Sequence, residues 1–148
     1  NFHPDRLIDL IIHNEIVPAV NQIETHPFHQ QIETQKFLQE NNVQIESWGP
    51  FAEGKNNIFQ NELLLSIGKK YNKTIAQVVI RWLTQRGVIA IPKSTHKERM
   101  EENFNSLDFE LSAEEMEAIK ILDTNKSLFF DHRDPAMVKW LGERKLDV

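Results

Sequence analysis

Short apolar segments alternate with amphipathic helical stretches along the chain. Three segments have the character of buried parallel strands, at residues 19–23, 43–48 and 88–91. Around them, apolar residues recur at the three- and four-residue spacing of helices that bury one side. An order of helix, strand, helix, strand, helix, strand, helix is typical of βα units, which assemble into a parallel sheet. We therefore predict an α/β fold with three parallel strands.

Capping residues predict where the helices begin and end. Pro4 suits the first position of an opening helix behind a possible His3 cap. Further helices are predicted over residues 32–41, roughly 60–71 and 75–86, and from about 113 to 122. The last two begin with capping boxes, in which a Ser or Thr is followed three residues later by Gln or Glu: Thr74 with Gln77, and Ser112 with Glu115. Gly87 is a good stop for the helix before it.

The chain divides at residue 123. Residues 1–123 carry the strand and helix pattern, whereas residues 124–148 mix aromatic residues with charges and are predicted to form a semi-ordered arm. A parallel sheet of three strands cannot close on itself, and closed (β/α) barrels need about 250 residues. The opening Asn-Phe-His-Pro has the character of a loop with no strand before it. We therefore expect an incomplete fold whose open edges favour self-association or pairing with a missing N-terminal half.

Composition excludes several classes of protein. A net charge of −5 argues against binding to nucleic acid or to an acidic membrane surface. No apolar run approaches the ~20 residues of a membrane span. Because the chain has no cysteine, disulfides and thiolate chemistry are excluded. These features are compatible with a cytoplasmic location, which we expect.

The turn after the third strand is the strongest candidate for ligand binding. Lys93 follows the strand, and Arg99 lies in the first turns of the next helix. Free N–H groups at a helix start attract anions, and these two cations would suit a phosphate monoester. The alternative is that Thr95 and Glu98 form an ordinary capping box and that the cations are simply solvated. Spacing alone leaves both interpretations open.

Several motifs together resemble the aldo-keto reductase family. Residues 18–27 (PAVNQIETHP) are similar to its sixth-strand motif, residues 45–51 (IESWGPF) to its seventh, and residues 91–104 (IPKS through Arg99 to ENF) to its eighth-strand cofactor motif. Asn1-Phe2 resembles the end of the fifth-strand motif, and the match extends to about residue 123. Within the family, residues 48–55 (WGPFAEGK) and the tail resemble bacterial small-carbonyl reductases of the diketogluconate reductase type.

The resemblance implies the C-terminal part of a (β/α)8 TIM barrel, about strands six to eight, in an NADPH-dependent oxidoreductase that reduces aldehydes or ketones. Trp48 matches the aromatic residue that stacks on the nicotinamide ring. Asn1 and Gln22 match the side chains that bind its carboxamide, which requires both a donor and an acceptor. From the residues alone, a core aromatic at a strand end is the favoured interpretation of Trp48, and Gln22 could be a polar residue inside the barrel.

Other positions match the rest of the dinucleotide site. The implied 2′-phosphate pocket comprises Lys93, Ser94, Thr95 and Arg99. The implied adenine contacts are Glu102 and Asn103, and the segment over the pyrophosphate comprises Gly49, Pro50, Phe51 and the loop 52–57. Gly54 would let this loop bend. Gly49 often corresponds to serine in the family, so only backbone contact is expected there.

The family's catalytic Asp, Tyr, Lys and His come from its first four strands, which have no counterpart in this sequence. We therefore assign no catalytic residue. Tyr71, the single tyrosine, follows Lys69-Lys70 on a predicted helix and is expected to be structural. Trp140 in the tail is expected to shape the carbonyl pocket. His26 and His29 give only a weak metal signal, because Pro27 prevents a helix that would align them, and no metal is expected.

Overall fold

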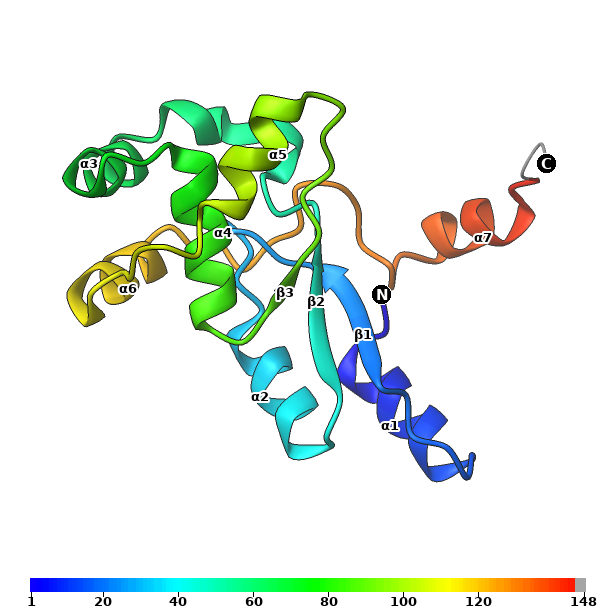
Figure 1. Ribbon diagram of the computed structural model, residues 1–148. Helices are drawn as coiled ribbons and strands as arrows, with labels where there is room; N and C mark the ends of the chain where they lie inside the picture. The colour runs from blue at the N-terminus through cyan, green and yellow to red at the C-terminus, as the bar shows by residue number, and fades with distance from the viewer. Residues whose placement is uncertain (146–148) are drawn as a thin grey trace.

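Three parallel strands form the centre of the fold (Figure 1). The computed structural model describes residues 1–145. The strands are β1 (Val20–Glu24), β2 (Gln44–Trp48) and β3 (Ile89–Ala90), in the order β1-β2-β3, with both pairs parallel. This confirms the predicted sheet. The third strand is shorter than predicted, and Pro92, which has no N–H to donate, follows shortly after it.

The predicted helices are present, with ends within two residues of prediction for most. They are α1 (Pro4–Ile12), α2 (Ile32–Glu40), α3 (Glu62–Tyr71), α4 (Ile75–Gln85), α5 (Lys97–Phe104) and α6 (Ala113–Lys120). A further helix, α7 (Pro135–Glu143), was not predicted. A 3-10 segment, η1 (Ala52–Gln60), was not predicted and precedes α3. Its middle has five residues in non-helical conformations, so it is an irregular loop with short helical turns rather than a regular helix.

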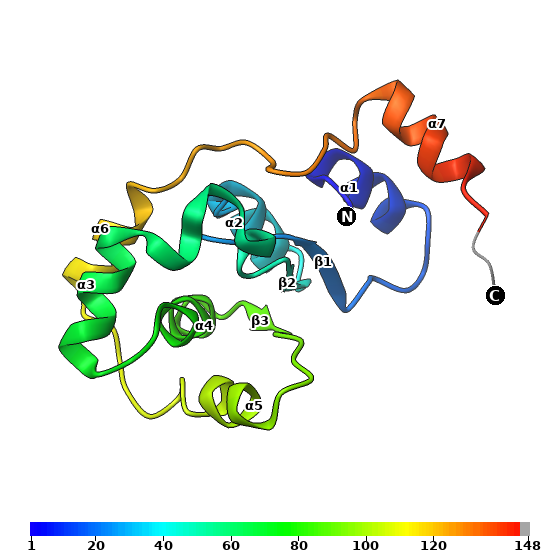
Figure 2. The same ribbon diagram turned by 90° about the horizontal axis from the view of Figure 1, so that it is seen from above.

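One face of the sheet is covered by helices and the other is not. Figure 2 shows α2 and α4 on one side of the strands, with α3 and α6 beyond them. Side-chain burial follows the two-residue period of strands: Asn21 and Ile23 are buried, whereas Val20 and Gln22 are exposed. Parallel sheets are normally buried on both faces. Within residues 1–145, the second face has no helical layer over it.

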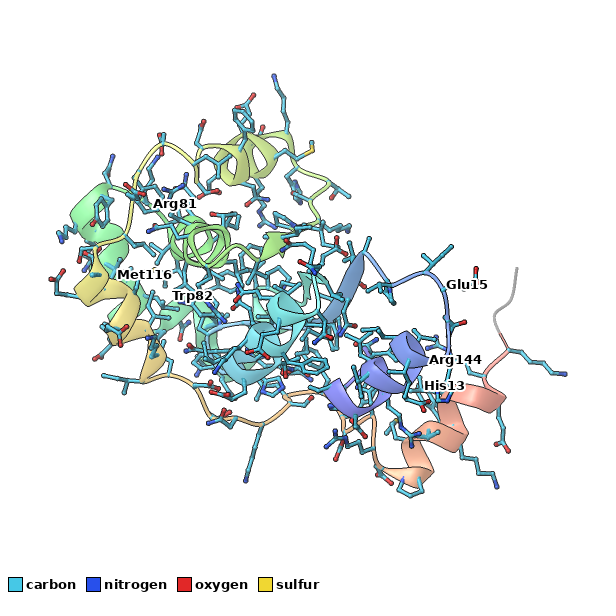
Figure 3. All side chains as sticks on the ribbon, turned by 90° about the horizontal axis from the view of Figure 1, so that it is seen from below. His13, Glu15, Arg81, Trp82, Met116 and Arg144 are labelled. Atoms are coloured by element: carbon cyan, nitrogen blue, oxygen red, sulfur yellow. The ribbon has the colours of Figure 1, made fainter. Side chains whose placement is uncertain are left out.

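The core lies between the sheet and the helices. Leu38, Val78 and Leu83 are completely buried there. Trp82 of α4 is 1% exposed and lies among densely packed side chains, whereas Arg144 and His13 lie at the periphery (Figure 3). The Arg86 guanidinium lies 4.4 Å from the Trp82 ring centroid, and burial lowers the pKa of Arg86 to about 10.

Two of the three predicted capping boxes form. Thr74 and Gln77 cap α4 reciprocally, and Ser112 and Glu115 cap α6 in the same way. The predicted box of Thr95 and Glu98 is wrong, because α5 begins at Lys97 and its N-cap residue is His96, which makes no side-chain cap. The preceding Ser94 hydroxyl instead accepts the His96 N–H at 3.1 Å. His3 is the N-cap residue of α1 but likewise makes no side-chain bond.

The tail is more regular than predicted. Residues 135–143 form α7, whose N-cap Asp134 accepts the Ala136 N–H at 2.9 Å, with Pro135 at the first helical position. These are ordinary helix-start signals that the prediction of a semi-ordered arm overlooked. None of the side chains of α7 is buried. The last three residues of the predicted arm, 146–148, lie outside the described residues.

The length and polarity of a helix determine whether it can cross a membrane. No helix formed by residues 1–145 combines the length and the apolar character that crossing a bilayer requires.

We predict that replacing Thr74 with alanine lowers the free energy of unfolding by about 1 kcal/mol, because it removes a formed N-cap. Thr95→Ala should change it by no more than a few tenths of a kcal/mol, since Thr95 caps no helix. Urea denaturation of both variants measures this difference. Equal losses would show that Thr95 caps α5 in solution.

Candidate functional site

The carboxyl ends of the three strands meet at one edge of the sheet. Parallel pairing places Glu24 beside Trp48, as the last register pair of β1 and β2. It also places Ser47 beside Ala90, so that the segments following β2 and β3 leave the sheet at the same edge. In sheets of this kind, functional side chains come from the loops that follow the strands. The predicted site residues gather at this edge in two groups.

The first group comprises Asn1, Gln22 and Trp48. The Trp48 indole Nε1–H donates to Asn1 Oδ1 at 2.5 Å, and the Asn1 amino group donates to the Gln22 carbonyl oxygen at 2.7 Å. The Gln22 side chain donates to Glu46 at 2.5 Å. The buried Asn21 side chain bonds both the N–H and the C=O of Phe2 and so fixes the opening segment against β1. This group offers amide donors and acceptors beside an aromatic ring.

The second group lines a cavity of about 630 Å³ between η1, α4 and α5. Six of the predicted residues contribute to its wall: Phe51, Lys93, Ser94, Arg99, Glu102 and Asn103. Phe59 and Leu65 add an apolar side to it. The cavity therefore combines an apolar surface with cations, the Glu102 carboxylate and an amide, as a binding site for a flat, charged ligand would. Thr95, the remaining predicted residue of the turn, is exposed.

The charges in this cavity suit an anion. Within residues 1–145, neither Lys93 nor Arg99 forms an ion pair or donates a side-chain hydrogen bond to another residue. By contrast Lys73, which lines the same cavity, is paired with Asp108 at 2.6 Å. The N-terminus of α5 lies on the same turn and adds a partial positive charge. Two unneutralised cations at a helix start can bind a phosphate group.

A short segment connects the two groups. Trp48 of the first and Phe51 of the second are separated by Gly49 and Pro50 only. Gly49 has φ +61°, which glycine adopts without strain. The loop after it bends again at Gly54, with φ +78°, as predicted. One extended ligand could therefore contact both groups along this segment.

The tail supplies a contact that sequence reasoning missed. Residues 127–130, here called the tail turn, bring Phe129 to 5.0 Å from the Trp48 ring, between centroids. The Glu24 carboxylate accepts the His26 Nε2–H and the Leu128 N–H, each at 2.9 Å, and the Ser127 hydroxyl at 2.5 Å. Because more than 100 residues separate Glu24 from Ser127, no local sequence pattern indicates this contact.

Burial alone would raise the pKa of Glu24. The hydrogen bonds from His26, Ser127 and Leu128 outweigh it and hold this pKa below its usual range. Glu24 is therefore a buried, ionised carboxylate at the functional edge. The neighbouring His29 has its pKa lowered by burial, which disfavours its charged form.

The remaining candidates lie away from the two groups. The Tyr71 hydroxyl donates to Glu115 at 2.6 Å, a bond that raises the tyrosine pKa and joins α3 to α6. This contact supports a structural role for Tyr71. Trp140 is 52% exposed on α7, which extends away from the sheet in Figure 1. Its role in substrate binding stays a prediction. Within residues 1–145, His26 and His29 belong to no group of three or more potential metal ligands.

The sequence is similar to known reductases. The family model described as "Aldo/keto reductase family" matches residues 1–124. Aldose reductase B of Dictyostelium discoideum is 42% identical over 84% of this chain and 40% of its own length. Methylglyoxal reductase DkgA of Yersinia pestis is 44% identical over 86% of this chain and 46% of its own length. The chain thus spans less than half the length of these relatives.

The fold is also similar to solved structures. A crystal structure of a Gox0644 mutant in complex with NADPH superposes with a TM-score of 0.83 and 37% identity, over 88% of this chain and 48% of that one. MGS-M4, an aldo-keto reductase from a deep-sea metagenome library, gives a TM-score of 0.84 and 36% identity over the same shares. The open three-stranded sheet and its helices correspond to part of the (β/α)8 barrel of these enzymes. The chain belongs to the aldo/keto reductase family.

Proposed function

We propose that the chain carries the cofactor-binding part of a cytoplasmic, NADPH-dependent oxidoreductase that reduces small aldehydes or ketones to alcohols. The observation that carries this proposal is the pair of unneutralised cations, Lys93 and Arg99, in a cavity joined by Phe51 to Trp48. The reductase names of the relatives and the NADPH complex of Gox0644 support the same reaction class.

The residues present fit a dinucleotide with a 2′-phosphate. Lys93 would contribute a compact charge and Arg99 a planar fork, both suited to a phosphate monoester. Glu102 and Asn103, on the same wall, would bond the polar edge of the adenine. Because NADH lacks this phosphate, the two cations would select NADPH.

The first group would orient the reactive ring. NADPH, when bound, supplies a hydride for the carbonyl carbon. Trp48 would present its indole face to the nicotinamide, while Asn1 and Gln22 bond the carboxamide and so fix which ring face is turned outward. Phe129 would exclude water from the side of Trp48 that it covers.

We propose no proton donor within residues 1–145. The Tyr71 hydroxyl already donates a hydrogen bond to Glu115, and this contact joins α3 to α6. The tyrosine, lysine, histidine and aspartate that the family uses would come from its first four strands. Trp140 remains the residue proposed to face the substrate.

The second candidate function is a catalytically silent half-barrel. Its support is the sheet face without a helical layer, where Val20, Ile89 and Ile91 are 40–50% exposed. Apolar strand residues in such a position favour association. We propose that this face is covered by a second copy of the chain or by a separate N-terminal half.

Replacing Arg99 with alanine should weaken NADPH binding by roughly tenfold or more, the magnitude expected for a charge-assisted hydrogen bond. NADH binding should change little, since NADH lacks the 2′-phosphate. Fluorescence titration with each cofactor measures both affinities. Lys97→Ala is the matched control, because Lys97 lies on the same helix but pairs with Glu101. Equal losses for NADPH and NADH in Arg99→Ala would contradict the phosphate assignment.

The purified 148-residue chain tests the silent half-barrel. If it is a silent half-barrel, it should not oxidise NADPH in the presence of small aldehydes, and light scattering should report a dimer or larger assembly. Turnover above the buffer rate would eliminate the silent module. A well-folded monomer would eliminate the requirement for a partner.

A further inference from the structure

Glu24 lies in an unexpected environment. By the alternation of β1 it belongs to the row of Val20 and Gln22, both exposed on the face without a helical layer. Glu24 itself is only 5% exposed, because the tail turn covers it. An ionised carboxylate is costly to bury unless it is fully hydrogen-bonded. Its charged state in this position therefore depends on the donors that surround it.

The carboxylate organises the tail turn. It accepts from the Leu128 N–H at 2.9 Å and from the Ser127 hydroxyl at 2.5 Å. The same hydroxyl oxygen accepts the N–H groups of Phe129 at 3.0 Å and Phe130 at 3.1 Å. His26 donates a further hydrogen bond at 2.9 Å. Both oxygens of an ionised carboxylate accept hydrogen bonds, so Glu24 can accept from all these donors. The neutral amide of glutamine cannot, because only one of its two polar atoms is an acceptor.

The tail turn then contacts the proposed cofactor site at two places. Phe129 packs against Trp48, and its ring would lie 3.7 Å from a Cβ placed on Gly49. The Lys55 ammonium donates to the Leu128 carbonyl at 2.8 Å and lies 3.8 Å from the Phe129 ring centroid. Lys55 belongs to the loop after β2. One turn thus connects Glu24 to the ring and to the loop of the site.

A separate contact holds the tail before this turn. Thr124 donates to the Phe28 carbonyl oxygen through both its N–H, at 2.9 Å, and its hydroxyl, at 2.8 Å. Asp123 accepts the Gln30 N–H at 3.3 Å. Loss of the Glu24 charge would therefore leave the tail attached and disturb mainly the turn that carries Phe129.

We propose that Glu24 is a positioning residue of the cofactor site: it fixes the tail turn, so that Phe129 orients Trp48 and Leu128 holds Lys55 and its loop. The part of this inference that concerns NADPH rests on the proposed function. The part that concerns Trp48 does not, because it depends on protein contacts alone.

The Glu24 contribution to stability should depend on pH. The titratable groups that face Glu24 are His26, which bonds it, and His29 and His132, which interact with it through charge. Because the folded-state pKa of Glu24 is below the ordinary value of 4.5, its contribution is complete above pH 4.5 and is lost as pH falls through the lowered value. The difference in unfolding midpoint between the wild type and Glu24→Gln should therefore be constant at neutral pH and close in acid. A difference that widens in acid would contradict an ionised Glu24.

The direct test is Glu24→Gln in the full chain labelled with 5-fluorotryptophan. Fluorine NMR should show a shifted or broadened Trp48 resonance, assigned by Trp48→Phe, and an unchanged Trp82 resonance. NADPH affinity, from fluorescence titration, should fall about tenfold, as for a lost hydrogen bond to a charge. Glu115→Gln is the matched control: it removes another buried carboxylate, bonded to Lys70 and Tyr71, and should leave the Trp48 resonance and NADPH affinity unchanged.

The outcomes separate this inference from the proposed function. If the Trp48 resonance is unmoved in Glu24→Gln, the positioning role is wrong whatever the cofactor affinity. If the wild type binds no NADPH, the proposed function fails, while a shifted Trp48 resonance still supports the positioning of Trp48. If Glu24→Gln does not fold, Ser127→Ala, which keeps the carboxylate and removes the hydroxyl, should produce the same selective shift of Trp48. Equal shifts of Trp48 and Trp82 would indicate a general loss of packing and overturn the proposal.

Discussion

Parallel pairing of β1, β2 and β3 is the constraint on which the rest of the structure depends. It brings three strand ends to one edge, so that residues far apart in the sequence, such as Glu24 and Trp48, become neighbours. It also requires long connections between strands, and here these are the helices that cover one face. The opposite face has no such layer within residues 1–145, which explains why exposed and buried side chains alternate from Val20 to Ile23.

The two halves of the proposed site use different physical interactions. In the cavity beside α5, Lys93 and Arg99 are near solvent and unneutralised, so they can attract an anion at little cost in desolvation. At the other end, Glu24 is buried and its charge is already satisfied by protein donors. One end is therefore ready to bind a charged ligand. The other is arranged to hold an aromatic ring in place.

Much of the fold could be predicted from sequence because its signals are local. The capping boxes at Thr74 and Ser112 formed, since each needs only residues within one helical turn. The box at Thr95 failed for an equally local reason: the Ser94 hydroxyl accepts the His96 N–H, and the helix begins later. The start of α7 at Asp134 had a clear signal that the aromatic and charged composition of the tail obscured.

The site was predictable only in part. Spacing placed Lys93 and Arg99 on one turn, and the family resemblance added Asn1, Gln22 and Trp48, which the structure brings together. No local pattern could indicate that Glu24 bonds Ser127, because more than 100 residues separate them and the alternation of β1 predicts an exposed side chain. Contacts of this kind follow from the tertiary fold alone.

The central claim is that one dinucleotide contacts both groups. Amide and indole NMR shifts, measured while the labelled chain is titrated with NADPH or with NADH, test this claim directly. NADPH should shift the Trp48 indole and the amides around Lys93 and Arg99, and NADH should reproduce only the shifts near Trp48. Identical shift patterns for both cofactors, or NADPH shifts confined to other parts of the chain, would contradict a site that joins these two groups along the segment from Trp48 to Phe51.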